Sequence, residues 1–317
     1  MQKIPVFGTI AHAYGFAVTQ FFRILGITWA PLAVSIAVSL MLTPGFAGNH
    51  MPLNDQDEIA RQTLRLLPLS FLVLLVIRSM VAVGVTELAL GLRKGPTFVY
   101  FSIGAPVWRL FGAWLLFLLV MILIYIGLII LVIVLAVVGG IAIKAAALSH
   151  GADMIAIAGL AALCALLFLG ALVYVLARLT FLIPPVIVAE KKIDLARGWE
   201  LTRGNFWRIL AIGITLFIPV IVAGCAVFLA VYGTGMIHTM TEIFVLAGRG
   251  ASEAVMQQHI DAMSEAMRAK GLALWPVTAA ANLLVETFLF GLLYGASAFA
   301  YRALTPGPAA PSLRDPR

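Results

Sequence analysis

An apolar stretch without charge, about 34 residues long from Leu110 to Ile143, limits the folds open to this chain more than any other feature. A helix needs about 20 apolar residues to cross a bilayer, so this stretch is long enough to span a membrane. It exceeds one crossing, and we expect the helix to tilt, to protrude, or to end early at Gly139 and Gly140. The whole chain is 62% hydrophobic and 11% charged, whereas soluble domains are about half apolar and a quarter charged. Lipid must therefore solvate much of the chain.

Five other apolar stretches alternate with polar segments, and we predict an all-α, polytopic transmembrane helical bundle with six spans and short interfacial amphipathic helices before the odd spans. A single domain, residues 1–303, contains the spans, which we place at about residues 23–42, 66–90, 110–138, 155–182, 206–231 and 275–301. Residues 232–271 are expected to form an extracytoplasmic amphipathic segment. Residues 304–317 are Pro-rich and are expected to be a disordered cytoplasmic tail.

The distribution of Lys and Arg predicts the orientation of these spans. Six spans place both termini on one side, and that side holds 14 of the 21 Lys and Arg residues. The other side holds six, and Arg78 lies within a span. Cytoplasmic loops carry the excess of positive charge, so we expect a multi-pass protein of a bacterial cytoplasmic (inner) membrane with both termini in the cytoplasm.

Two polar segments carry signals for short helices. In the first, Asp194 is a candidate N-cap and Gly204 a candidate end. In the second, Ser252 is a candidate N-cap and Gly271 a candidate end. The helix between them has an apolar stripe: Met256, Ile260, Met263 and Met267. We interpret it as an amphipathic helix that lies on the outer leaflet or caps the bundle, with a metal-handling methionine cluster as the alternative.

The odd-numbered spans begin alike, each with an aromatic residue followed by arginine: Phe22–Arg23, Trp108–Arg109 and Trp207–Arg208. This pattern is either a threefold repeat of an interfacial helix and a hairpin, or the general tendency of aromatic and basic residues to collect at cytoplasmic helix ends. Mitochondrial carriers also have three two-helix units, but their Pro-x-acid-x-x-base signature is absent after the odd spans.

Arg78 and Glu286 are charged residues in the middle of predicted spans. Such a charge costs about 2.5–3.5 kcal/mol on insertion scales, so it normally faces protein and finds a partner. Their similar depths suggest that they pair with each other. We favour a buried ion pair that locks the second span to the sixth, and the alternative is a polar site for a lipid headgroup, a solute or a proton.

The segment from Arg178 to Leu210 carries the most distinctive motif. An arginine near the end of the fourth span is followed by a Pro pair, an acidic residue, a Trp-x-Leu-Thr-x-Gly motif and an aromatic–Arg helix start. These features fall on Arg178, Pro184, Glu190, Trp199, Leu201, Thr202, Gly204, Trp207 and Arg208. The segment resembles bacterial six-span proteins related to the membrane domain of glycerophosphodiester phosphodiesterases. The resemblance implies a six-span membrane domain. The catalytic barrel of those enzymes is not expected here, because no segment outside the membrane is large enough to form one.

The same segment supplies a candidate interfacial site on the cytoplasmic side. Its members are Arg178, Glu190, Arg197, Trp199, Gly204 and Arg208. We favour the positive-inside rule as the reason for these basic residues. A binding site for anionic lipid is the alternative.

No familiar enzymatic motif is present in the sequence: there is no Walker loop, no Gly-x-Ser-x-Gly elbow and no His-Glu-x-x-His. We therefore predict a non-enzymatic membrane module that binds lipid or organises partners, with a transporter or channel for a small or amphiphilic solute, using Arg78 and Glu286, as the alternative. An intramembrane enzyme ranks third. We expect no catalytic residue, cofactor or metal. Membrane lipids, with anionic lipids as candidates, are the expected partners and nucleic acid is not, and the sequence leaves homo-oligomerisation open.

Overall fold

The computed structural model describes residues 2–42, 56–93, 98, 100–146, 153–250 and 252–305, and over these residues it contains helices and no strand. The predicted all-α polytopic architecture is confirmed, because six of the helices are long and apolar enough to cross a membrane. In chain order the helices are α1 (Val6–Thr19), α2 (Phe21–Leu42), α3 (Gln56–Ala89), α4 (Ala105–Ala146), α5 (Asp153–Thr180), α6 (Ile183–Glu190), α7 (Leu195–Leu201), α8 (Phe206–Tyr232), α9 (Thr234–Gly248), α10 (Glu253–Ala273) and α11 (Trp275–Leu304).

Each of the six candidate membrane segments overlaps one of the expected spans. They are Phe21–Val38, Leu64–Ala89, Ala105–Ile130, Leu163–Glu190, Phe206–Tyr232 and Trp275–Leu304. The fourth segment contains a break, because α5 ends at Thr180 and α6 begins at Ile183. Pro184 and Pro185 occupy the first turn of α6, where the missing backbone N–H groups of proline cost no helical hydrogen bond.

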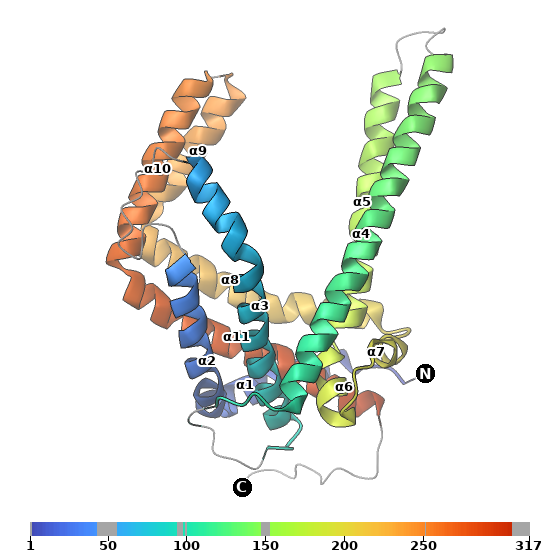
Figure 1. Cartoon of the computed structure of the whole chain (residues 1–317), viewed down its shortest axis with the longest axis vertical. Coiled ribbons are helices and arrows are strands. Elements are labelled where there is room, and N and C mark those ends of the chain that lie inside the picture. The colour runs from blue at the N-terminus through green and yellow to red at the C-terminus, as the bar shows by residue number, and fades with distance from the viewer. Residues whose placement is uncertain are drawn as a thin grey trace.

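Helix α4 is longer than a single crossing needs. It has 42 residues, which at 1.5 Å per residue corresponds to about 63 Å, against a hydrocarbon core of about 30 Å. The helix continues through Gly139 and Gly140 to Ala146, so the sequence-based option of an early end at the two glycines is wrong. Together with α5 it forms a hairpin that stands apart from the other helices at its far end (Figure 1).

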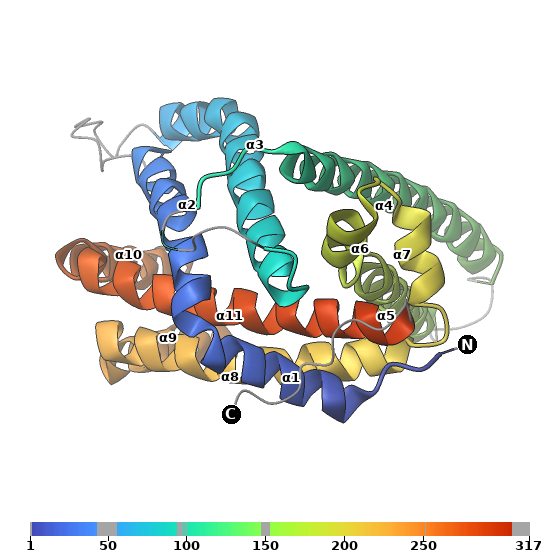
Figure 2. The same ribbon diagram turned by 90° about the horizontal axis from the view of Figure 1, so that it is seen from below.

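Helix α11 is the centre of the fold, with contacts to α1, α2, α3, α6 and α8. Seen from below, α1 lies alongside α11 and α8 lies beside them (Figure 2). Small residues allow this close approach. A Cβ atom on Gly291 would lie 3.2 Å from the backbone Cα of Ala17, and one on Gly295 would lie 2.8 Å from Cδ1 of Phe16.

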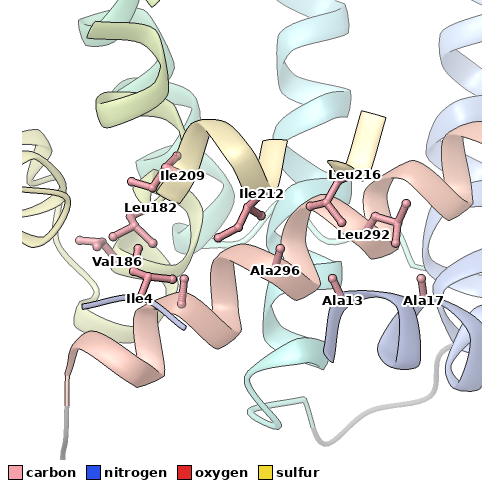
Figure 3. Packing of buried hydrophobic residues seen from close by; sticks show 11 residues of the cluster. Ile4, Ala13, Ala17, Leu182, Val186, Ile209, Ile212, Leu216, Leu292 and Ala296 are labelled. Carbon is pink, nitrogen blue, oxygen red and sulfur yellow. The ribbon is translucent and has the colours of Figure 1, made fainter. Parts of the chain in front are cut away.

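One of the described core clusters joins α1, α6, α8 and α11. Its side chains point inward from all four helices and from the chain before α1 (Figure 3). The labelled members are Ile4, Ala13, Ala17, Leu182, Val186, Ile209, Ile212, Leu216, Leu292 and Ala296. Burial of this apolar surface holds α1 and the start of the chain against α8 and α11.

Residues 232–271 form two helices, of which only the second was expected. Helices α9 and α10 lie side by side as a hairpin (Figure 1). Ser252 occupies the N-cap of α10 with extended backbone, but its hydroxyl makes no capping hydrogen bond. The helix ends at Ala273, two residues beyond the expected end at Gly271. Met256, Met263 and Met267 are half-buried along it.

Short helices precede two of the three odd-numbered spans. Helix α1 leads into α2, and α6 and α7 lead into α8. Before α4, however, the described residues 98 and 100–104 are not helical. In the described residues, the second unit of the proposed threefold repeat therefore has its hairpin, α4 and α5, but no interfacial helix before it. The predicted tail, residues 304–317, lies outside the described residues apart from Leu304 and Thr305.

Candidate functional site

Arg178 is buried in the structure, with only 4% of its surface exposed. It lies in the last turn of α5, and its guanidinium donates hydrogen bonds to the Tyr174 hydroxyl at 2.8 Å, to Thr202 Oγ1 at 3.3 Å and to the backbone carbonyl of Trp199. The same group lies 3.6 Å from the centroid of the Trp199 ring. A buried cation needs such a set of partners. Arg178 therefore joins α5 to α7, and its guanidinium is not exposed for a ligand.

Glu190 and Arg197, two other residues of the predicted interfacial site, contact each other. Glu190 Oε1 lies 3.4 Å from Arg197 Nε and accepts a hydrogen bond of 3.1 Å from the Tyr301 hydroxyl. The carboxylate of Asp194 accepts a hydrogen bond from the backbone N–H of Arg197 at 2.8 Å, which confirms the predicted N-cap. Through these contacts the segment between α6 and α7 is fixed to α11.

Gly204, Asn205 and Arg208 hold the start of the chain. Gly204 has a φ of +75°, a conformation that glycine adopts without strain, and it turns the chain from α7 into α8. Asn205 accepts a hydrogen bond from the backbone N–H of Ile4 at 3.0 Å and donates one to Gln2 O at 3.2 Å. Arg208 Nη1 donates to Ile4 O at 2.7 Å. Sequence analysis did not predict this contact, which joins residues about 200 positions apart.

Three basic side chains around this assembly remain exposed: Lys191, Lys192 and Arg203. Within the described residues, none of them forms a salt bridge or a hydrogen bond through its side chain. The basic residues of this segment thus fall into two groups in the structure. Arg178, Arg197 and Arg208 are engaged in packing, and the other three cations face outward.

Arg78 on α3 and Glu286 on α11 meet, as the sequence suggested. Arg78 Nη2 lies 3.4 Å from Glu286 Oε1, and the guanidinium lies 5.4 Å from the centroid of the Phe290 ring. The expectation of a buried pair is wrong, however, because 48% of the Arg78 side chain and 35% of the Glu286 side chain are exposed. Each of the two side chains thus contacts protein on one side and is exposed on the other.

A groove that is mostly apolar but contains the polar side chains of Ser35, Thr278 and Asn282 leads along α11 to Glu286. It has a volume of about 230 Å³. Its lining residues are Leu32, Ser35, Ile36, Trp275, Thr278, Ala279, Asn282, Leu283 and Glu286, and these residues define what we call the α2–α11 groove. Thr278, Asn282 and Glu286 are spaced four residues apart and so share one helix face. The predicted site omitted Asn282 and Ser35, although the four-residue spacing was visible in the sequence.

A larger, apolar cavity of about 540 Å³ lies among α4, α5, α6, α8 and α11. Trp114, Phe181, Pro184, Ile209, Phe217 and Tyr294 are among its lining residues, and we call it the five-helix cavity. The lining includes no Asp, Glu, His, Lys, Arg or Cys side chain. Cavities of 300–1,000 Å³ accommodate ligands. The sequence could not indicate this cavity, because each helix contributes ordinary apolar residues.

A small polar pocket of about 280 Å³ lies at the α3–α4 connection. Glu87, Arg93, Tyr100 and Ser102 line it, and the Arg93 guanidinium lies 4.2 Å from the centroid of the Tyr100 ring. Burial raises the pKa of the Tyr100 phenol, and the negative charge of Glu87 raises the same pKa further. The phenol is therefore protonated and uncharged at neutral pH.

Metal-ligating side chains are dispersed over the described part of the chain, where no three His, Cys, Asp or Glu residues lie close enough to hold an ion. In comparisons with known proteins, no family model, no curated protein and no solved structure matches the chain. The resemblance to phosphodiesterase-associated membrane domains therefore stays a prediction that rests on the motif between Arg178 and Arg208.

Proposed function

We propose that this multi-pass membrane protein is a non-enzymatic module that binds an anionic phospholipid, with one acyl chain in the five-helix cavity. The observation that carries the proposal is the cavity itself, which is half-open, lies among α4, α5, α6, α8 and α11, and is lined almost wholly by apolar side chains. Apolar surface of this kind binds hydrocarbon through the hydrophobic effect. With hydroxyls as its polar groups, the cavity offers no acid–base pair, which supports binding rather than catalysis.

The exposed cations Lys191, Lys192 and Arg203 would give the protein a preference for anionic over neutral lipid. Lys191 and Lys192 directly follow α6 and Arg203 lies just before α8, and both of these helices line the cavity. Basic residues at a membrane surface attract anionic lipid by about 1 kcal/mol each. A phospholipid with its chain in the cavity and its phosphate near these residues satisfies both features.

We further propose that this end faces the cytoplasm, with both termini on that side of a bacterial cytoplasmic membrane. The excess of Lys and Arg on the termini side supports this orientation, through the positive-inside rule. The inner leaflet would then supply the lipid. The resemblance of the Arg178–Arg208 motif to phosphodiesterase-associated membrane domains fits a membrane module without a catalytic barrel.

A transport role, our alternative from the sequence, needs a route through the protein. The α2–α11 groove and the five-helix cavity have no lining residue in common. Phe290, which is buried, lies along α11 between Glu286 and Tyr294. The described arrangement therefore favours a binding module over a continuous pathway.

Filling the cavity tests the proposal. Gly213 lines the cavity, and a Cβ atom added to it meets no atom within 4 Å. Gly213→Leu should therefore fold and occupy the space meant for the acyl chain. Gly224→Leu is the matched control, because Gly224 lies on the same helix, has equally open space and does not line the cavity.

The measurement is native mass spectrometry of the protein released from nanodiscs that contain phosphatidylglycerol. We expect the lipid-bound fraction to fall at least about tenfold in Gly213→Leu, since each displaced methylene removes about 0.8 kcal/mol, and to persist in Gly224→Leu. Equal lipid retention in the two variants would overturn the cavity as the binding site. Loss of retention in both would also overturn it, and absence of lipid from the wild type would favour a partner-organising role.

A second experiment tests the charge preference separately. Substitution of Lys191, Lys192 and Arg203 by Gln should reduce the preference for phosphatidylglycerol over phosphatidylcholine by a factor on the order of 100, from about 1 kcal/mol per residue. Arg249→Gln, at the end of α9, is the control. An unchanged preference would show that the bound lipid is selected by something other than these cations.

A further inference from the structure

The α2–α11 groove contains polar groups that need a partner. No side-chain hydrogen bond joins Asn282 or Ser35 to another described residue. Asn282 is exposed, although it lies in the first half of a helix that is long and apolar enough to cross a membrane. In hydrocarbon, an unsatisfied amide costs several kcal/mol. Lipid is therefore a poor occupant for the groove.

Glu286, at the inner end of the groove, also needs a hydrogen-bond partner. Its Oε1 atom makes the single contact with Arg78, at 3.4 Å, and within the described residues its Oε2 atom has no hydrogen-bond partner. A carboxylate that is one-third exposed inside a membrane helix is stabilised by water or by a polar cavity. The groove has room for several water molecules, and its polar side chains give each of them partners.

Close packing seals the groove beyond Glu286. The hydroxyls of Thr28 and Thr287 are 2.8 Å apart and both side chains are buried. Around them, Ile24, Ile27 and Phe290 belong to a core cluster that joins α2, α3 and α11. At the other end the lining begins at Trp275, the first residue of α11, where the chain arrives from α10. One end of the groove therefore lies beside the α9–α10 hairpin, and packing closes the other end beyond Glu286.

From these observations we propose that the α2–α11 groove is a water-filled half-channel that admits water and small hydrophilic solutes from the α9–α10 side as far as Glu286. Asn282, Ser35 and Thr278 hydrate it, and the Arg78–Glu286 pair lies at its closed end. The half-channel does not depend on lipid binding in the five-helix cavity.

Cysteine accessibility in sealed membrane vesicles of known orientation tests the half-channel. The background is the full chain with Cys164→Ala and Cys225→Ala. Asn282→Cys places a thiol in the groove, and Leu284→Cys is the matched control, because Leu284 is 47% exposed and does not line the groove. Ser252→Cys, at the exposed start of α10, marks the side of the membrane. The probe is a charged, membrane-impermeant methanethiosulfonate.

We expect Asn282→Cys to react from the same side as Ser252→Cys and at least about tenfold faster than Leu284→Cys, because the reactive thiolate forms in water and not in lipid. Thr278→Cys, one turn nearer the mouth, should react at least as fast and provides a second reading if Asn282→Cys does not fold. Ser297→Cys, beyond the seal, should not react from that side.

Three results would overturn the half-channel. Asn282→Cys and Thr278→Cys that react as slowly as Leu284→Cys would place lipid or protein in the groove. Reaction from the opposite side would show that the closed end has been assigned wrongly. Reaction of Ser297→Cys from the Ser252 side would show a continuous pathway, and so a channel in place of a half-channel. The first two results do not bear on the cavity-filling experiment, whereas the third would connect the groove to Ser297, which lines the five-helix cavity.

Discussion

The guanidinium of Arg178 lies 3.6 Å from the centroid of the Trp199 indole ring and donates a hydrogen bond to the carbonyl of the same residue. Arg178 on α5 thus contacts both the ring and the backbone of Trp199 on α7. Because α7 leads directly into α8, this contact also fixes the direction in which α8 begins. The Trp-x-Leu-Thr-x-Gly motif therefore has a structural role, in which Trp199 and Thr202 bind Arg178 and Gly204 turns the chain.

Replacement of Arg178 by Ala should lower the free energy of unfolding by about 3 kcal/mol, from the loss of charged hydrogen bonds and a cation–π contact. Thermal unfolding in detergent measures the change. Arg178→Lys should recover little of the loss, because an ammonium group cannot reproduce the geometry of the guanidinium fork. Arg203→Ala, in the same motif but exposed, is the control and should be nearly neutral. Equal losses in Arg178→Ala and Arg203→Ala would contradict the structural role.

Asn205→Ala should release the start of the chain from α8. The substitution removes the acceptor for Ile4 N–H and the donor to Gln2 O, and Ile4 is fully buried. A buried donor left without a partner costs about 1–3 kcal/mol. Amide hydrogen exchange at residues 2–4 should become faster by one to two orders of magnitude. Asn205→Asp keeps the acceptor, so Ile4 should stay protected while the contact with Gln2 is lost. Full protection in Asn205→Ala would show that Ile4 is held by packing alone.

Local rules predicted local features of the fold correctly. Asp194 is a helix N-cap, because a side-chain acceptor has the same effect in any protein. The helix α6, which Pro184 and Pro185 open, was not predicted from the sequence. Arg78 and Glu286 were also expected to meet, because a charge in a membrane needs a partner. Their exposure could not be predicted, since it depends on where α2 and α4 lie around them.

The cavity and the centre of the fold depend on contacts that no local pattern encodes. The five-helix cavity is lined by apolar residues that look like any other part of a span. Helix α11 is central because Gly291 and Gly295 let α1 approach, and such small residues occur throughout the sequence. Arg178 was placed in a cytoplasmic basic cluster, and only the fold shows that Trp199 covers it.

Gly291→Ala should destabilise the contact between α11 and α1. The added Cβ would lie 3.1 Å from Cβ and 3.2 Å from Cα of Ala17, and these atoms cannot move without the helix backbone. Overpacking of this kind costs about 1–3 kcal/mol. Gly224→Ala, with open space around its Cβ, should be neutral or slightly stabilising. Thermal unfolding of the two variants distinguishes close packing from a general effect of glycine replacement, which would shift both equally.

A double-mutant cycle on Arg78 and Glu286 tests whether their contact stabilises the protein. Arg78→Leu leaves the Glu286 carboxylate without its cation, whereas Arg78→Leu with Glu286→Leu removes both charges. We expect the single variant to unfold more readily than the double variant. The coupling energy should be about 1 kcal/mol, as for interhelical hydrogen bonds in membranes.

The control cycle pairs Arg78→Leu with Asn282→Leu, because Asn282 lies one turn from Glu286 and makes no described contact with Arg78. Its coupling energy should be near zero. Additive losses for Arg78 and Glu286 would show that water at the end of the α2–α11 groove stabilises each charge separately. In that case the contact at 3.4 Å would align the two side chains without holding α3 to α11.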